Sequence, residues 1–239
     1  MAAGIPAPFR LLRLDSVDST NDEIRRRALT GEAEGLVLVA ERQTAGRGRR
    51  GAAWFSPPGE SLAFSILLRP AEPKVLWPRL ALAAGLAVAE ALGSQAGVKW
   101  PNDVWIRRRK VAGILIEAGP DFAVVGIGVN INLMDFPDGI LATSLRLETG
   151  QDHCSEEVME QILRRFELHR LQIGADFEFI LNEVRLRCVL TGRRVTLTTA
   201  SGPRAGWMEG IAAGGELLLR TERGIEKLIQ ADEVRLMLE

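Results

Sequence analysis

The sequence predicts an α+β protein with two domains, at residues 1–188 and 189–239. Up to about residue 188, segments with the apolar spacing of helices alternate with segments typical of strands, whereas every later segment is short and strand-like. The chain of 239 residues is long enough for one large and one small domain, and its 46% of apolar residues is typical of a protein with a buried core. We therefore expect helices packed on a sheet in the first domain, followed by a small all-β domain.

Four helices are expected in the first domain. The first covers residues 20–29, because Thr20 and Glu23 form a capping box at its start and Gly31 follows its end. The other three have an apolar face and lie at 80–89, just after Pro78, from Ser155 through at least Phe166, and at 177–187.

Strands are expected where short runs of apolar and β-branched residues stand between turn signals. In the run at 62–68 every second residue is large and apolar (Leu62, Phe64, Ile66 and Leu68), and Pro70 ends it. The other strands of the first domain are expected at 36–40, 104–106, 111–117 and 123–132. The second domain has five short runs with glycine turns between them, which suggests a small closed barrel; they lie at 194–199, 204–211, 216–220, 224–229 and 234–238.

Composition and charge exclude several classes of protein. The net charge of −1 argues against a nucleic-acid coat or a polybasic membrane-binding protein. The longest unbroken apolar run, at 80–89, is far shorter than the roughly 20 residues that span a bilayer, and the first ten residues lack the basic and apolar regions of a signal peptide. Cys154 and Cys188 are far apart and form no CxxC motif, so we expect reduced thiols, no zinc site and a cytoplasmic protein.

A glycine-rich loop at 43–51 holds three arginines, Arg47, Arg49 and Arg50. Its glycines match the G-x-G-x-x-G pattern of dinucleotide-binding proteins, but two consecutive prolines prevent the helix that should follow, and the acidic residue expected about 20 positions on is missing. Glycines let backbone N–H groups approach an anion closely, and guanidinium groups donate charge-assisted hydrogen bonds to it. The loop therefore predicts an anion site, with a solvated arginine-rich hairpin as the alternative.

A second polar segment runs from Lys99 to Asp103 and continues to Lys110. Asn102 and Asp103 lie where one element ends and a strand starts, so turn formation alone explains them, and the Trp-Pro pair before them is expected to be extended. Lys110 starts a strand, and Gly113 leaves room for a group to pack there. Lys110 is therefore either a lysine that takes part in the chemistry or a solvated lysine at the end of a strand.

Two asparagines, Asn130 and Asn132, interrupt the apolar strand at 123–132 and are expected on the same face. Buried amides need hydrogen-bond partners. They are therefore either structural or used to recognise a polar ring or a ribose.

Taken together and in this order, these segments resemble the biotin–protein ligases, of the type without an N-terminal DNA-binding domain. The resemblance covers residues 15–148, and its motifs are Asp18-Ser-Thr-Asn21, residues 43–51 with Trp54, Lys99-Trp-Pro-Asn-Asp103, Lys110-x-x-Gly-Ile-Leu-x-Glu117 and Gly126-x-Gly-x-Asn130. It implies a mixed sheet with flanking helices, like the catalytic domain of class II aminoacyl-tRNA synthetases. The all-β tail resembles that family's small C-terminal domain, which implies an SH3-like barrel.

The resemblance also implies an activity: biotin and ATP form biotinyl-5′-adenylate, and biotin then passes to a lysine of a biotin carboxyl carrier protein, with Mg²⁺ bound through the ATP phosphates. The implied catalytic residues are Lys110, Arg47 and Arg49. The implied biotin site consists of Ser19, Thr20, Asn21, Gln43, Arg47, Gly48, Arg49 and Lys110. The implied ATP site consists of Arg47, Arg49, Trp54, Asn102, Asp103 and Asn130. Asp103 is also a candidate for placing Mg²⁺ or the acceptor lysine.

Some alternatives stay open at this point. A lipoate or octanoate ligase would share the fold and the adenylation chemistry, although the arginine-rich loop and the barrel-like tail favour biotin. A non-catalytic nucleotide- or RNA-binding module would use the same basic loop. Only 14 residues precede Asp15, so we expect no DNA binding. Ala52 and Ala53 stand where members of the family often carry a further basic residue, and the loop at 133–145 has no assigned role. The sequence leaves open whether the protein is a monomer or a homodimer.

Overall fold

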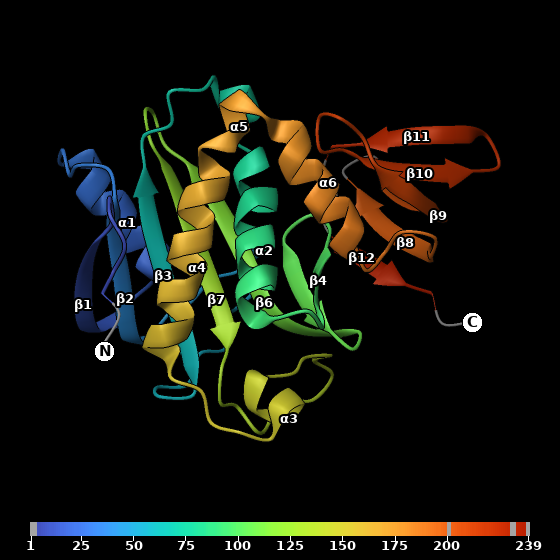
Figure 1. The fold of residues 1–239 in the computed structure, drawn as a ribbon. Coiled ribbons are helices and arrows are strands. Elements are labelled where there is room, and N and C mark those ends of the chain that lie inside the picture. Colours follow the sequence, from blue (N-terminus) through green and yellow to red (C-terminus); the bar gives the residue numbers. More distant parts are fainter. Residues whose placement is uncertain (1–3, 200–201, 230–232, 238–239) are drawn as a thin grey trace.

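The computed structural model describes residues 4–199, 202–229 and 233–237. The described strands form two sheets, one of seven strands and one of five (Figure 1). The larger sheet has the order β1-β2-β3-β7-β6-β5-β4. Its strands are β1 (Arg10–Val17), β2 (Leu36–Gln43), β3 (Ser61–Leu68), β4 (Ala96–Lys99), β5 (Asp103–Ile106), β6 (Arg109–Ala118) and β7 (Ala123–Asn130). Because β1 and β2 pair in parallel and all other neighbours are antiparallel, the sheet is mixed, as expected.

Helices cover both faces of this sheet. Helix α1 (Thr20–Leu29) packs on one face through Ile24 and Ala28. On the opposite face lies α2 (Arg79–Leu92), with α4 (Ser155–Arg170) and α6 (Phe177–Arg187) beside it (Figure 1). Successive residues of a strand point to opposite faces, so the central strands are buried on both. The alternation expected at 62–68 is therefore replaced by a continuously buried strand.

The segment Lys74–Leu92, which ends in α2, is long and apolar enough to cross a membrane by length and composition, with a mean hydropathy of 1.5. However, 56% of it is buried inside the protein, where it contacts α4, α6 and the sheet. Its apolar character is that of a core helix.

Several elements differ from the expectation. The sequence did not predict β1, β4 and the two short helices α3 (Leu145–Thr149) and α5 (Gln172–Ala175). The Trp100–Pro101 peptide, expected to be extended, is a cis peptide in the turn between β4 and β5. Strand β7 ends at Asn130, so Asn132 lies beyond the strand rather than on one of its faces.

The smaller sheet is antiparallel and has the order β11-β10-β9-β8-β12. All five expected strands are present, as β8 (Arg194–Thr199), β9 (Gly202–Ile211), β10 (Leu217–Thr221), β11 (Gly224–Leu228) and β12 (Glu233–Leu236). The hydrogen-bonded order ends at β11 and β12, and closure into a barrel stays a prediction.

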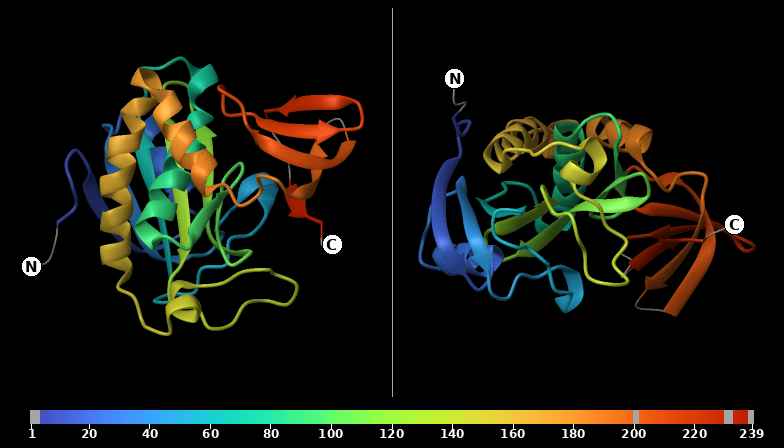
Figure 2. Two further views of the ribbon diagram at one scale, coloured as in Figure 1. Left: turned by 45° about the vertical axis from the view of Figure 1, so that its right-hand side comes forward. Right: turned by 90° about the horizontal axis from the view of Figure 1, so that it is seen from below.

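The two sheets share one apolar core. The smaller sheet lies beside α6 and the β4 edge of the larger sheet (Figures 1 and 2). The indole Nε1 of Trp100 donates to the Gly215 carbonyl at 2.9 Å, and the Val189 N–H donates to the Val98 carbonyl at 3.0 Å. Val195 of β8 belongs to the same apolar cluster as Leu82 of α2. The predicted domain boundary at 188/189 coincides with the passage from α6 to β8, but the core crosses it.

Candidate functional site

A narrow pocket lies where the start of α1, the glycine-rich loop and strands β6 and β7 meet. All eight residues expected for biotin line it, namely Ser19, Thr20, Asn21, Gln43, Arg47, Gly48, Arg49 and Lys110. Trp54 and Asn102, expected for ATP, also line it, whereas Asp103 and Asn130 do not. Its free volume is about 50 Å³, which is room for one or two water molecules at ~30 Å³ each.

The start of α1 supplies the polar end of the pocket. Ser19, not Thr20, caps the helix, since the Ser19 Oγ accepts from the Asp22 N–H at 3.5 Å. The capping box predicted at Thr20 is therefore wrong by one residue. The Thr20 hydroxyl and backbone N–H both donate to Gln43 Oε1, at 3.1 and 2.8 Å, so Thr20 connects the helix to β2 instead.

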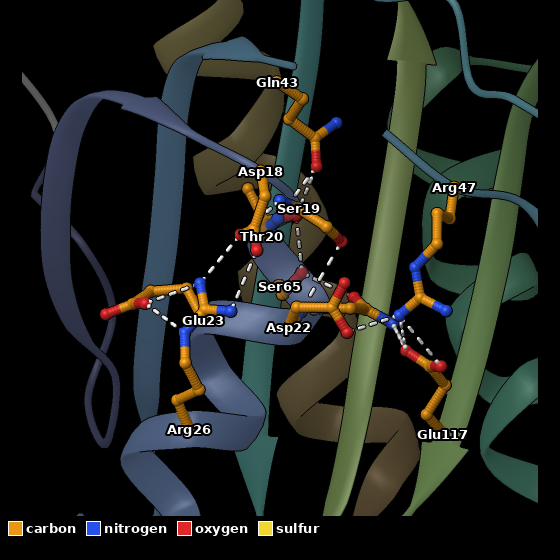
Figure 3. A network of polar contacts seen from close by, with 11 residues as sticks. Asp18, Ser19, Thr20, Asp22, Glu23, Arg26, Gln43, Arg47, Ser65 and Glu117 are labelled. Atoms are coloured by element: carbon orange, nitrogen blue, oxygen red, sulfur yellow. Dashed lines mark hydrogen bonds and ion pairs between the residues drawn. The ribbon is translucent and has the colours of Figure 1, made fainter. Parts of the chain in front are cut away.

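Ser65 on β3 supports this end of the pocket from below, although the sequence analysis did not single it out. Its side chain is fully buried, and its Oγ lies 2.6 Å from Asn21 Oδ1 and 2.8 Å from Thr20 Oγ1 (Figure 3). One sequence signal could have identified Ser65: it is a lone hydroxyl residue in an otherwise apolar strand, and a buried hydroxyl needs a hydrogen-bond partner.

Two carboxylates hold the first arginine of the loop. Arg47 Nη2 lies 2.5 Å from Asp22 Oδ1 and 3.3 Å from Glu117 Oε1 (Figure 3). Glu117 Oε2 also accepts from Asn21 Nδ2 at 2.7 Å. Neither carboxylate was predicted to have a role, although Glu117 ends one of the motifs that resemble those of the biotin–protein ligases.

The second arginine faces the other side of the pocket. Arg49 Nη1 donates to Asn102 Oδ1 at 2.9 Å, and Asn102 Nδ2 donates to the Ile114 carbonyl at 2.8 Å. Burial lowers the pKa of the Arg49 guanidinium, and the neighbouring Arg50 lowers it further, whereas Asp103 opposes both. Arg49 stays protonated because an arginine pKa starts far above neutral pH, so a fixed cation stands at this side.

Lys110 is paired with Asp103, at 2.7 Å between Nζ and Oδ1. The loop at 133–145, to which the sequence assigned no role, holds the backbone of this lysine. The Lys110 N–H donates to the Leu141 carbonyl, and the Lys110 carbonyl accepts from the Thr143 N–H. Asn130 Nδ2 donates to the carbonyls of Thr143 and Lys110, at 3.0 and 3.4 Å. Asn130 is thus structural here, and a contact of its side chain with a nucleotide stays a prediction.

Trp54 fills most of the pocket. Its indole lies on Gly128 and Gly113, so close that a Cβ added at Gly128 would come within 2.3 Å of it. The space expected beside Gly113 is therefore occupied by the Lys110 side chain and Trp54. Lys110 Nζ lies 5.5 Å from the ring centroid. The indole Nε1 is buried and has no hydrogen-bond partner, which is a costly arrangement for a polar group.

A larger cavity of about 1300 Å³ adjoins the pocket. The two share Gly48, Arg49, Trp54, Asn102 and Lys110, and the larger one extends past Asp103 to the smaller sheet. Strand β12 contributes residues to its wall. This cavity has the space for a ligand much larger than the pocket admits.

Comparisons with known proteins agree with these features. A model described as the biotin/lipoate A/B protein ligase family matches residues 14–133. The bifunctional ligase/repressor BirA of Bacillus subtilis (strain 168) is 35% identical over 93% of this chain and 73% of its own. The biotin–[acetyl-CoA-carboxylase] ligase of Paracoccus denitrificans is 34% identical over 92% of this chain and 98% of its own. The solved structure of the biotin protein ligase from Aquifex aeolicus in complex with biotin and ATP has a TM-score of 0.86 at 34% identity, over 95% of this chain and 99% of that one.

Proposed function

The chain belongs to the biotin/lipoate A/B protein ligase family, and from this premise we propose how its pocket carries out the reaction of a biotin ligase. The enzyme activates biotin with ATP to biotinyl-5′-adenylate and transfers biotin to a lysine of a biotin carboxyl carrier protein. One observation in the structure carries this function. The eight residues expected for biotin come from three separate segments of the chain and converge on one pocket.

Adenylate formation brings together two anions, the biotin carboxylate and the triphosphate of ATP. We assign the neutralising charge to Lys110 and Arg49, which line the pocket and the larger cavity alike. In the reaction a carboxylate oxygen attacks the α-phosphorus, and pyrophosphate leaves with the electron pair of the broken P–O bond. Cations lower this barrier when they stand where the charge develops. Arg49 is already held there by Asn102, whereas Lys110 exchanges Asp103 for the incoming carboxylate.

The donor set of the site fits a magnesium ion that arrives with ATP. Within the described ranges, no three His, Cys, Asp or Glu side chains are grouped so as to hold a metal ion. Mg²⁺ is commonly bound through substrate phosphates and one or two carboxylates. Asp103, which faces the larger cavity, is our candidate for that carboxylate. The ion would supply further positive charge at the phosphates.

The second step needs access for a lysine of the carrier protein. Its uncharged amine attacks the carbonyl carbon of the mixed anhydride, AMP leaves with the electron pair of the broken C–O bond, and the proton lost by the amine passes to solvent. We propose that the nucleotide and the acceptor lysine both occupy the larger cavity, where Trp54 would serve the nucleotide. Asp103 is then also placed to orient the acceptor amine.

The architecture supports two further proposals. We propose that the mixed sheet with helices on both faces has the class II aminoacyl-tRNA synthetase-like fold, with a domain boundary near 188/189. We also propose that the five-stranded antiparallel sheet is an SH3-like barrel. Both sheets contribute to the wall of the larger cavity, so the second domain would help to enclose the nucleotide.

We propose that the reaction takes place in the cytoplasm, where ATP is abundant and the two free cysteines stay reduced. We also propose that these 239 residues do not bind DNA sequence-specifically. Their net charge is −1, and Arg47 and Arg49 of the basic loop already have protein partners.

A pyrophosphate-exchange assay with biotin, lipoate and octanoate side by side tests the function. Exchange of labelled pyrophosphate into ATP that depends on biotin is the expected result. Exchange driven by lipoate or octanoate instead would identify a ligase for those acids. A folded protein that binds ATP but gives no exchange with any of the three would be a non-catalytic nucleotide-binding module.

A further inference from the structure

We infer that Glu117 is a positioning residue that fastens the glycine-rich loop over the pocket by holding Arg47 and Asn21 at the same time. The inference rests on the proposed function of the pocket. It assigns Arg47 to loop closure and leaves Arg49 and Lys110 to face the reacting atoms.

The contacts of Glu117 join three parts of the chain. Glu117 lies near the end of β6, and its side chain is 23% exposed. Its Oε2 accepts from Asn21 Nδ2 at 2.7 Å, and its two oxygens lie 3.3 and 3.4 Å from Arg47 Nη2 (Figure 3). One carboxylate therefore connects β6, the first turn of α1 and the loop.

Glu117 also fixes the orientation of the Asn21 amide. Asn21 Oδ1 accepts from Ser65, so its NH₂ group is directed to Glu117. Gly126 permits this position, because a Cβ there would come within 2.2 Å of Asn21 Oδ1. Since Asn21 is only 4% exposed, the amide has little freedom to turn without losing a partner.

The surroundings of Arg47 are unsuited to a phosphate. Asp22 and Glu117 place two carboxylates on one guanidinium, so the group as a whole is negative. A phosphate brought here would meet like charge. On the other side of the pocket, Arg49 and Lys110 present two cations around the single carboxylate of Asp103. We therefore place the phosphates of ATP on the side of Arg49 and Lys110, and we assign Arg47 to closing the loop.

Closure matters because the adenylate is a mixed anhydride, which must stay bound and shielded from water until the acceptor arrives. The ion pairs that close the loop are partly exposed, with 38% of the Arg47 side chain and 32% of the Asp22 side chain accessible. Salt screens such pairs. Retention of the adenylate should therefore weaken as ionic strength rises.

The decisive variant is Glu117→Gln. Its amide oxygen can still accept from Asn21 Nδ2, but it carries no charge for Arg47. We expect release of preformed, labelled biotinyl-adenylate, chased with unlabelled biotin, to be about 3- to 10-fold faster, the effect of losing one partly exposed charged contact. We also expect the dependence of the release rate on NaCl between 50 and 500 mM to become weaker, with the remaining dependence due to the Asp22–Arg47 pair.

Three comparison variants separate charge from position. Asp22→Asn removes the other carboxylate from Arg47 without touching the Asn21 amide, so it should also speed release. Glu117→Ala removes the acceptor for Asn21 as well, so it should in addition raise the KM for biotin. Glu41→Gln removes an equal charge from an exposed site on strand β2 of the same sheet, where no ion pair is described, and should change nothing.

Unchanged release in a normally folded Glu117→Gln variant would overturn the inference. Slower release would overturn it too, since Glu117 would then compete with the ligand for Arg47. If Glu117→Gln does not fold, Asp22→Asn decides between the same outcomes. The proposed function fails separately, if the wild-type protein shows no biotin-dependent exchange at all.

Discussion

The peptide groups on both sides of Lys110 are hydrogen-bonded, so the backbone from which its side chain projects has little freedom to move. The loop at 133–145 and the Asn130 amide contact the peptide groups, while the ammonium group lies between Asp103 and the Trp54 ring. A lysine that was merely solvated at a strand end would need none of this support. The ammonium is compact and exchanges partners easily, which suits a group that must leave Asp103 for an incoming carboxylate.

Replacing Lys110 by Ala should lower biotin-dependent pyrophosphate exchange by about 10²- to 10³-fold, since one preorganised charge contributes roughly 3–4 kcal/mol to a transition state of this kind. The fold should persist, as circular dichroism would show. Lys110→Arg should not restore the rate, because a planar guanidinium cannot replace the ammonium at 2.7 Å from Asp103. Exchange at near wild-type rate in the alanine variant would leave Lys110 without a role in the reaction.

Trp54 should move when biotin binds, because a free volume of about 50 Å³ cannot admit the ligand while the indole occupies the pocket. Leaving the pocket exposes more of the partly buried indole and gives its unpartnered Nε1 a hydrogen bond. We expect biotin alone to shift the tryptophan emission to longer wavelength, and Trp54→Phe to abolish the shift although four other tryptophans remain. If calorimetry shows that biotin binds to the wild-type protein and the tryptophan emission spectrum does not change, this movement is contradicted.

Secondary-structure elements were predictable where they are long and periodic. The apolar face of α4 and the small residues of α2 specify helices from local sequence, and the same holds for the runs that form β3 and β7. The missed elements lack such a signal. Strand β1 is an edge strand of largely exposed residues, and β4, α3 and α5 are each five residues or shorter. Tertiary contacts, not local pattern, stabilise elements of this kind.

The site was predictable to a similar degree. The motif residues converge as expected, but the groups that hold them in place were not identified. Ser65, Asp22 and Glu117 act through partners that are between 25 and 96 residues distant in sequence. They come together only when β3, β6 and β7 pair in the folded protein. Local sequence patterns do not reveal that these distant residues are close in space.

An ion pair between Asp18, which precedes α1, and Arg26 in the last turn of α1 should make stability depend on pH. Arg26 donates to both oxygens of Asp18, at 2.9 and 2.7 Å, and so lowers the pKa of this carboxyl to about 2, with help from the Ser19 N–H. Since the folded pKa lies below the unfolded one, the stabilisation is present above about pH 4 and is lost as the pH falls toward 2.

Asp18→Asn should therefore lower the free energy of unfolding at pH 6 by up to about 1 kcal/mol, as is usual for exposed pairs. Urea titrations at successively lower pH should show the difference from wild type shrinking between pH 4 and 2. Asp15→Asn is the matched control, because Asp15 is exposed on β1 and has no described partner. If the difference in unfolding free energy between Asp18→Asn and wild type does not depend on pH, the charge of Asp18 is not what stabilises α1.

At the scale of the whole molecule, the change of composition near residue 190 marks a change of sheet but not a break in the core. Val195, Met208 and Leu217 of the smaller sheet pack in the same apolar cluster as Leu82 and Phe177. A Cβ at Gly97 would come within 2.7 Å of the Arg187 carbonyl oxygen, so the backbones approach closely at the junction. Composition predicts where a chain changes its secondary structure, whereas the extent of a cooperative unit depends on packing between distant segments.

Because the core is continuous, the two sheets should unfold in one transition, with equal calorimetric and van't Hoff enthalpies. Trp100→Phe keeps an aromatic ring at the junction but removes the indole N–H that satisfies the Gly215 carbonyl. It should cost about 1 kcal/mol, or roughly 2–4 °C in Tm, and shift the whole transition. Trp207→Phe, at a half-exposed site on β9, should change the stability by less than about 0.5 kcal/mol. Two separate transitions, of which Trp100→Phe shifts only one, would show that the smaller sheet is an independent folding unit.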